Sequence, residues 1–361
     1  MDFNVLAEKI KNSREKILVI SDTDLDGKMS MVLMNIILKK LNKNFIPYFR
    51  IRGENNIELL KIISGIIKNN NEIKTIIFLD TPINDKNLID FAKNIFKGEI
   101  IYIDHHKRKL PEEIPENLFY FDIRAIYNIE LCTTSIIYKI GKSLFGPEFI
   151  KYSLIAAVGA VGDFMFDYDK ELMFDLKLSY RQFYTGRSFT TPFIFYYYLL
   201  LILYPYEIIK ENIEDILNIT DFLKKVNFKY INKTATKYYN YIKDLKKIYE
   251  SEKLIVFESR SSGTVSTIVS SFYPNKLVVV LSLKDKGIIY RIFKRKERRY
   301  KVSLRYQNSK GIDIGKIINE FSKKYGISGG GHPKAAGGLI YERDIKNLIN
   351  FLEEKLKNEK N

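Results

Sequence analysis

The sequence has few of the residues that cross-link a chain or anchor it in a membrane. Its 361 residues include one cysteine, Cys132, which excludes an intramolecular disulfide framework and a zinc site built from several cysteines. The longest apolar and aromatic run, Phe193–Tyr206, is shorter than the roughly 20 residues of a membrane span. The opening stretch MDFNVLAEKIKNSREK lacks the apolar core of a signal peptide. We therefore expect a soluble protein of the reducing cytoplasm, without a membrane partner.

Acidic residues are outnumbered. The chain has 59 lysines and arginines against 43 aspartates and glutamates, a formal net charge of +16. This excess favours an anionic partner, such as nucleic acid, a phosphorylated metabolite or an anionic membrane surface. The simpler interpretation is a lysine-rich surface that keeps the protein in solution. The length allows two or three domains, each with its own core.

The first 125 residues alternate between short apolar runs and longer helical stretches. This alternation is typical of a parallel α/β sheet, whose strands are apolar throughout because helices cover both faces. Strands are predicted at residues 16–21, 44–50, 74–80 and 99–104. Helical stretches at 135–144 and 154–164 are expected to complete this domain.

The pattern changes after residue 166 and returns at residue 251. We expect three parts: a parallel-sheet domain over 1–166, a helical insertion over 167–250 and a smaller α/β domain with a mixed sheet over 251–361. The insertion is expected to be helical at 208–219 and 237–249. The last part is expected to hold strands at 253–259 and 275–283, a hairpin with a charged tip at 294–298, a helix at 311–326 and a glycine loop that enters another strand.

The aromatic run Phe193–Tyr206 in the insertion has three interpretations. It could be a buried helix that covers the α/β core, since short apolar runs usually pack inside. It could form a subunit interface, where tyrosine and phenylalanine are enriched. It could also stack bases of a single-stranded nucleic acid.

Aspartates follow three of the predicted strands. They are Asp22, Asp24 and Asp26 after the first strand, Asp80 after the third, and Asp104 at the end of the fourth, directly before His105 and His106. In open parallel sheets, ligands bind beyond the carboxyl ends of the strands. We therefore expect these side chains to converge on one edge of the sheet.

The chemistry of this set predicts a metal site. Asp22, Asp24 and Asp26 are two residues apart, so in an extended segment they point the same way and repel unless a cation neutralises them. A solvated turn or a helix cap is the simpler explanation of these three alone. Carboxylates combined with imidazole suit Mn²⁺, with Mg²⁺, Co²⁺ or Zn²⁺ as alternatives. The carboxylates suffice for two ions, the usual arrangement for phosphoester hydrolysis.

Six segments, in order, resemble motifs of the DHH phosphoesterase superfamily and of the domain that accompanies it. DTDLDGKMS, FLDTP, IDHHKR and AAVGAVGDF resemble its four catalytic motifs. KVSLRY followed by SGGGHPKAAGG resembles the C-terminal domain that accompanies it in RecJ-like nucleases and oligoribonucleases. Asp22 stands where many family members have histidine, and RecJ-type nucleases often have aspartate there.

The resemblance implies a role for each residue of the acidic set. His105 would be a metal ligand and His106 a contact to the substrate phosphate, with Asp104 orienting the pair, so Asp104 and His106 are the candidate catalytic residues. One ion would bind Asp22, Asp24 and Asp80, and the other Asp26, Asp80, His105 and Asp163. Mn²⁺ is the expected cofactor, with two ions bound.

The resemblance also implies that the second domain holds the substrate across a cleft from the metal ions. Arg305 could clamp a phosphate, and a glycine motif could cradle one through its backbone N–H groups. The motif residues are Gly329, Gly330, Gly331 and His332. A plain glycine-rich turn is the alternative. The basic run Arg291–Lys301 could follow a nucleic-acid backbone or simply be solvated.

Together these features predict a RecJ-like exonuclease of the archaeal type, which degrades single-stranded DNA or RNA to mononucleotides in DNA repair or replication. Some relatives act 3′→5′ beside a Hef-type helicase–nuclease, and a homodimer or homotrimer is expected. One alternative is hydrolysis of short oligonucleotides, cyclic dinucleotides or 3′-phosphoadenosine phosphate. Another is a non-catalytic replication scaffold, against which the filled acidic positions argue.

Overall fold

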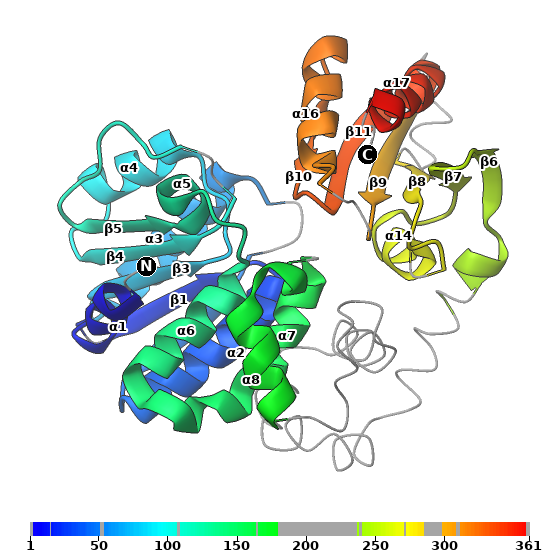
Figure 1. Ribbon diagram of the computed structural model, residues 1–361. Coiled ribbons are helices and arrows are strands. Elements are labelled where there is room, and N and C mark those ends of the chain that lie inside the picture. The colour runs from blue at the N-terminus through cyan, green and yellow to red at the C-terminus, as the bar shows by residue number, and fades with distance from the viewer. Residues whose placement is uncertain are drawn as a thin grey trace. The chain divides into compact units, whose positions relative to one another are not determined.

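The computed structural model describes residues 3–14, 16–50, 54–106, 109–163, 165–179, 237, 240–270, 272–284, 298–307 and 311–358. The chain divides into two compact units, Met1–Val226 and Asn227–Asn361. The predicted α/β class with two sheets is confirmed (Figure 1). The aromatic run Phe193–Tyr206 and the charged tip at 294–297 lie outside the described residues. The predicted domain limits therefore stay predictions.

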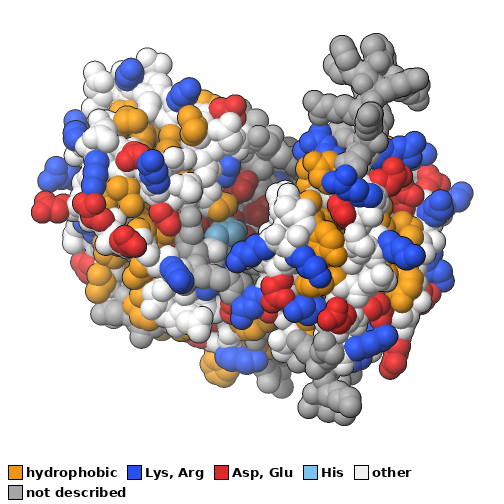
Figure 2. All heavy atoms as spheres, turned by 90° about the horizontal axis from the view of Figure 1, so that it is seen from above, with side chains coloured by type: hydrophobic (Ala, Val, Ile, Leu, Met, Phe, Trp, Pro, Cys, Tyr) orange, Lys and Arg blue, Asp and Glu red, His pale blue; other side chains and the backbone are white. Residues whose placement is uncertain are grey.

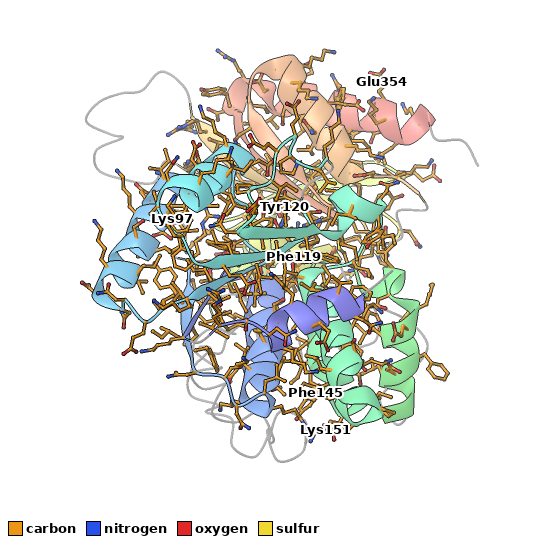
Figure 3. All side chains as sticks on the ribbon, turned by 90° about the vertical axis from the view of Figure 1, so that its left-hand side faces the viewer. Lys97, Phe119, Tyr120, Phe145, Lys151 and Glu354 are labelled. Atoms are coloured by element: carbon orange, nitrogen blue, oxygen red, sulfur yellow. The ribbon has the colours of Figure 1, made fainter. Side chains whose placement is uncertain are left out.

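The first unit contains a five-stranded parallel sheet in the order β2-β1-β3-β4-β5. Its strands are β1 (Ile17–Ser21), β2 (Phe45–Phe49), β3 (Thr75–Leu79), β4 (Glu99–Asp104) and β5 (Leu118–Asp122). Every residue of β1 and β3 is buried, as expected for strands covered on both faces. The four predicted strands are confirmed. The edge strand β5, with Phe119 and Tyr120 labelled in Figure 3, was not predicted.

Helices cover both faces of this sheet. Its helices are α1 (Phe3–Lys11), α2 (Leu25–Lys40), α3 (Asn56–Asn69), α4 (Asp85–Asn94), α5 (Ile123–Tyr127), α6 (Thr133–Phe145), α7 (Ser153–Gly162) and α8 (Lys170–Ser179), with 3₁₀ turns η1 (Gly146–Tyr152) and η2 (Phe166–Tyr168). The apolar sides of α3 and α4 share a core with one face of the sheet. In Figure 1, α1, α2, α6 and α7 lie on the side of the sheet opposite α4.

Helices α6 and α7, with η1 between them, form one long apolar stretch. By length and composition the stretch Thr133–Gly162 could cross a membrane, but 61% of its most apolar window is buried inside this unit. Gly159 allows the two helices to approach, because a Cβ there would clash with the side chain of Thr134. Gly162 similarly faces Leu25 of α2. The AAVGAVGDF motif therefore brings α7, and the Asp163 that follows it, close to α2 and α6.

The described residues of the second unit form a six-stranded mixed sheet in the order β10-β11-β9-β8-β7-β6, in which β7 and β8 are parallel and the other neighbouring strands are antiparallel. Its strands are β6 (Lys246–Glu250), β7 (Leu254–Glu258), β8 (Leu277–Leu283), β9 (Arg299–Arg305), β10 (Ser328–Gly331) and β11 (Ala335–Tyr341). Helices α16 (Ile314–Tyr325) and α17 (Ile345–Asn358), joined to β11 by the 3₁₀ turn η3 (Glu342–Asp344), share a core with one face. Helix α14 (Gly263–Ser270) packs on the other.

Two local predictions for the second unit were wrong. The helix expected over 237–249 does not continue to its end, because Lys246–Glu250 form β6, paired with β7. This edge strand is mostly exposed, so its sequence has no apolar alternation that would reveal a strand. The glycine motif is not a loop before a strand: Ser328–Gly331 form β10, which pairs with β11.

Candidate metal centre

The candidate metal ligands lie where the order of the first sheet reverses. The chain passes from β1 to β2 at one edge of the sheet and then back to β3 on the other side of β1. The connections that follow β1 and β3 therefore lead away from each other. A crevice forms at such a switch point beyond the carboxyl ends of the strands, and ligands usually bind there. The segment Asp22–Asp26 follows β1, and Asp80 follows β3.

The turn after β1 is a helix start. Asp24 is the N-cap of α2, and its Oδ1 accepts a hydrogen bond from the backbone N–H of Gly27 at 2.9 Å. A Cβ at Gly27 would clash with the backbone of Asp22, so glycine allows this tight turn. The cap explanation is therefore correct for Asp24. It does not explain Asp26, which is completely buried in the first turn of the same helix.

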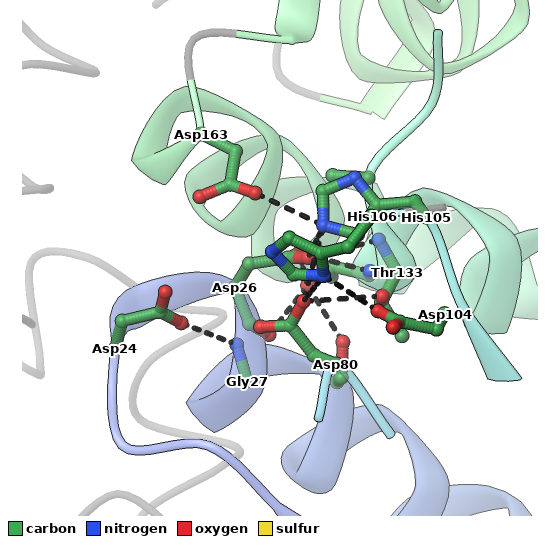
Figure 4. Close-up of polar contacts among 12 residues, drawn as sticks. Asp24, Asp26, Gly27, Asp80, Asp104, His105, His106, Thr133 and Asp163 are labelled. Atoms are coloured by element: carbon green, nitrogen blue, oxygen red, sulfur yellow. Dashed lines mark hydrogen bonds and ion pairs between the residues drawn. The ribbon is translucent and has the colours of Figure 1, made fainter. Parts of the chain in front are cut away.

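Four predicted ligands from distant parts of the chain meet here. Asp26, Asp80, His105 and Asp163 can each place one donor atom so that all four lie within 4.8 Å of one another (Figure 4). His105 Nε2 lies 3.1 Å from Asp80 Oδ1, 3.2 Å from Asp163 Oδ2 and 3.6 Å from Asp26 Oδ2. Asp80 takes a left-handed backbone conformation, with φ 52°, which turns the chain sharply at the end of β3.

The N-terminus of α6 holds Asp26 in place. The backbone N–H groups of Thr133 and Thr134 donate to Asp26 Oδ2 and Oδ1, at 2.8 and 2.9 Å. The hydroxyl of Thr134 also donates to Asp26 Oδ1, and that of Thr133 to Asp80 Oδ1 at 3.3 Å. The N-cap residue Cys132 makes no capping bond, so Asp26 serves as the cap from another helix. Sequence reasoning missed both threonines; their only signal was a TT pair before a predicted helix.

Asp104 contacts His106, as Figure 4 shows. Asp104 Oδ1 lies 2.7 Å from His106 Nδ1, and Tyr102 donates to Asp104 Oδ2 at 2.5 Å. Burial alone would raise the pKa of Asp104, but the charge and hydrogen bond of His106 outweigh burial and hold it well below its usual range. Burial would lower the pKa of His106, and Asp104 instead raises it to about 9. Asp104 thus orients His106, where the resemblance implied that it orients both histidines.

The cluster is electrostatically unfavourable without a cation. Burial, followed by the charges of Asp26 and Asp24, raises the pKa of Asp80 well above its usual value. Burial, followed by the charge of Asp163, also raises the pKa of Asp26. Burial among protein atoms and the charges of Asp163, Asp22 and Asp26 raise the pKa of Asp24 to about 7, although water reaches this exposed side chain and screens part of the effect. Carboxylates crowded against a buried imidazole fit a divalent cation.

The second predicted ion site is less complete. Asp24 is engaged in capping α2, and Asp22 Oδ1 accepts a hydrogen bond from the backbone N–H of Thr23 at 2.6 Å. The charge of Asp22 acts on Asp24 and that of Asp24 acts on Asp80, yet the four-residue cluster within 4.8 Å contains neither Asp22 nor Asp24. Binding of an ion by Asp22, Asp24 and Asp80 stays a prediction.

The predicted substrate contacts lie together within the second unit. The register pairs Arg305 with Ala335, three residues after His332, and the backbone N–H of His332 donates to Ala335 O at 2.7 Å to close the turn. Arg305 Nε donates to Thr267 Oγ1 at 3.2 Å. Gly329, Gly330 and Gly331 belong to β10, and Gly331 has φ 147°. Their assignment as substrate contacts stays a prediction.

Two family models match the chain. Residues 16–159 match the DHH family, N-terminal domain, and residues 256–358 match the DHHA1 domain. The first match contains Asp26, Asp80 and His105, and the second contains Arg305 and the hairpin formed by β10 and β11. The chain therefore belongs to the DHH phosphoesterase superfamily and carries its DHH and DHHA1 domains in that order.

Individual relatives are distant. The uncharacterized protein MJ0988 of Methanocaldococcus jannaschii is 24% identical over 381 residues, covering 99% of both chains. A DHH domain described as belonging to a family of ribosomal proteins has TM-score 0.64 at 14% identity, covering 98% of this chain and 89% of its own. RecJ from Thermus thermophilus in complex with Mn²⁺ has TM-score 0.56 at 14% identity, covering 99% of this chain and 55% of that one. Exonuclease RecJ bound to manganese has TM-score 0.52 at 16% identity, covering 98% of this chain and 94% of that one.

Proposed function

We propose that this protein is a metal-dependent exonuclease that hydrolyses single-stranded DNA or RNA to mononucleotides. The observation that carries the proposal is the buried cluster of Asp26, Asp80, His105 and Asp163 at the switch point of a DHH domain. The cluster joins hard carboxylate oxygens to an imidazole, a donor set that suits Mn²⁺. RecJ proteins of the same fold have been described with Mn²⁺ and with Mg²⁺.

The chain's own groups have separate tasks in this proposal. Asp26, Asp80, His105 and Asp163 would hold one cation, and Asp22, Asp24 and Asp80 a second. Two such cations would polarise a phosphoryl group and lower the pKa of the attacking water. His106 contacts Asp104 through its Nδ1. Its other ring nitrogen, Nε2, would contact the phosphate as a hydrogen-bond donor. Thr133 and Thr134 keep Asp26 oriented.

The second unit would supply the remaining contacts. Arg305, His332 and the glycines of β10 are proposed to hold substrate phosphates, with the active site in a cleft between the two domains. Participation in DNA repair or replication, a cytoplasmic location, a homodimer or homotrimer and a Hef-type helicase–nuclease partner belong to the same proposal. The role in repair or replication and the helicase–nuclease partner rest on the family resemblance. The cytoplasmic location rests on the single cysteine. An oligomer is favoured by the aromatic run Phe193–Tyr206.

Product mapping tests the proposal. Single strands of DNA and RNA, labelled at the 3′ or the 5′ end and 2 to about 20 nucleotides long, are incubated with Mn²⁺ or Mg²⁺, as are cyclic dinucleotides and 3′-phosphoadenosine phosphate. Stepwise release of mononucleotides from one end is expected, and the label released first gives the polarity. Cleavage limited to dinucleotides, cyclic dinucleotides or 3′-phosphoadenosine phosphate would instead establish the small-substrate alternative. A well-folded protein that binds Mn²⁺ but cleaves none of these substrates would support the scaffold alternative.

A further inference from the structure

Strand β9 carries a row of cations on one face. Side chains alternate along a strand, and Tyr300, Val302 and Leu304 are buried in the core beneath α16 and α17. The alternate residues of β9 therefore point to the opposite face, on which α14 packs. They are Arg299, Lys301, Ser303 and Arg305.

Helix α14 covers one end of this row and leaves the other accessible. Ser266 of α14 lies 2.8 Å from Ser303 Oγ, and Thr267 accepts a hydrogen bond from Arg305. The apolar side of α14 packs on β7 and β8. Lys301 is exposed and Arg299 is half-buried. The row therefore runs from Arg305, the predicted phosphate clamp, outward along the strand.

A fourth cation lies across from this end. The backbone N–H of Lys284 donates to Arg299 O at 2.9 Å, which continues the antiparallel register of β8 and β9 and sets Lys284 opposite Arg299. Lys284 is exposed. Lys284 therefore extends the row of cations from β9 onto the end of β8.

The neighbouring strands provide a flat surface beside the cations. The register sets Tyr341 opposite Arg299 and Leu339 opposite Lys301 on β11. Further along, Gly337 pairs with Gly330 of β10, and a Cβ placed on Gly330 would meet no atom within 4 Å in the part of the chain that the structure describes. Glycine and leucine on one sheet face suit sugars and bases, whereas the ring of Tyr341 already has the guanidinium carbon of Arg343 5.2 Å from its centroid.

We propose that this face of β9 is a track for the backbone of a single-stranded nucleic acid, on which Arg299, Lys301 and Lys284 bind phosphates beyond the one at Arg305. Arg299 and Lys301 stand about 7 Å apart along the strand, and Lys301 and Arg305 about 14 Å. On the face of the molecule that Figure 2 shows, lysines and arginines are interspersed with acidic side chains, so the net charge alone defines no binding surface. The proposal rests on the proposed function and extends it from the cleaved nucleotide to a longer strand.

The test compares two double variants of the full chain. R299Q/K301Q removes two cations of the track. K323Q/K346Q removes two exposed lysines from α16 and α17, which pack on the opposite face of the same sheet, and serves as the matched control. Binding of a fluorescent 20-mer is measured by anisotropy in a chelator at several salt concentrations, so that neither metal binding nor cleavage contributes. Cleavage of the 20-mer and of a dinucleotide is then measured with Mn²⁺.

The track predicts weaker 20-mer binding by R299Q/K301Q and a slope of log K against log salt that is smaller by about 1.4, since each phosphate contact to a single strand contributes about 0.7. The defect in 20-mer cleavage should exceed that in dinucleotide cleavage at least tenfold. An unchanged slope, or the same change in K323Q/K346Q, would overturn the track. If the wild-type protein cleaves no substrate but R299Q/K301Q still lowers the salt slope of binding, the proposed exonuclease activity is refuted and the track is supported.

Discussion

At the scale of single residues, the site is a set of carboxyl groups that folding brings so close together that ionising all of them is energetically unfavourable. Asp26 and Asp80 are almost completely buried, and burial together with neighbouring carboxylates raises the pKa of each. Asp80 also occupies a left-handed backbone conformation that few residues other than glycine, asparagine and aspartate tolerate. Such strain and repulsion are typical of sites that a ligand completes.

The raised pKa values predict that the metal-free protein loses stability as pH rises. A carboxyl group whose pKa is raised by folding keeps its proton in the folded state above pH 3.8, where the unfolded chain has released it. The free energy of unfolding is therefore higher at low pH and falls as the pH rises through the raised pKa. The raised pKa of His106 acts in the same direction between 6.5 and about 9. The melting temperature in chelator should therefore be lower at pH 8 than at pH 5.

Saturating Mn²⁺ should remove most of this difference, because it binds the ionised carboxylates. D80N is the matched variant: asparagine tolerates the same backbone conformation but carries no charge, so its metal-free melting temperature should depend less on pH. Melting curves of both proteins with and without metal make the comparison. A metal-free wild type that is more stable at pH 8 would contradict this account of the cluster.

At the scale of elements, the metal site depends on helices that meet through small residues. Gly159 brings α7 against Thr134 of α6, and α6 in turn directs its first N–H groups at Asp26 on α2. The partial positive charge of a helix N-terminus favours the ionised form of such a carboxylate. Three helices therefore position one ligand.

We predict that T134V binds Mn²⁺ about ten- to a hundredfold more weakly than the wild type, since groups that orient metal ligands typically contribute that much. Valine keeps the backbone N–H and the shape but loses the hydroxyl that donates to Asp26. T134S restores the hydroxyl and should recover most of the affinity. Calorimetric titration with Mn²⁺ measures the effect, and melting in chelator tests whether each variant is folded. Wild-type affinity in a folded T134V would show that the backbone N–H groups alone suffice.

At the scale of the whole molecule, the sequence predicted the features that repeat or cluster along the chain. Four strands and the aspartates that follow them could be identified because buried strands appear as short continuous apolar runs and ligands follow their carboxyl ends. Features defined only by tertiary contact could not be predicted. Thr133 and Thr134 gain a role when α6 docks on α2, and β6 is a strand only because β7 offers it a partner. A helix was wrongly predicted over Lys246–Glu250 because this exposed strand lacks the apolar alternation that would have indicated a strand.

The link between the two units can be tested through Arg305. If Arg305 clamps a phosphate whose neighbouring bond is cleaved in the first unit, R305A should lower kcat/KM for a dinucleotide about ten- to a hundredfold, the equivalent of roughly 1.5–3 kcal/mol for a charge-assisted contact. Mn²⁺ affinity, measured by titration, should stay at the wild-type value because the proposed ligands all belong to the first unit. T267V is the control for local packing: it removes the hydrogen bond of Arg305 Nε but keeps the guanidinium. Equal losses in R305A and T267V would assign Arg305 a structural role. Wild-type kinetics in R305A would refute the clamp, and with it the proposed placement of the active site between the domains.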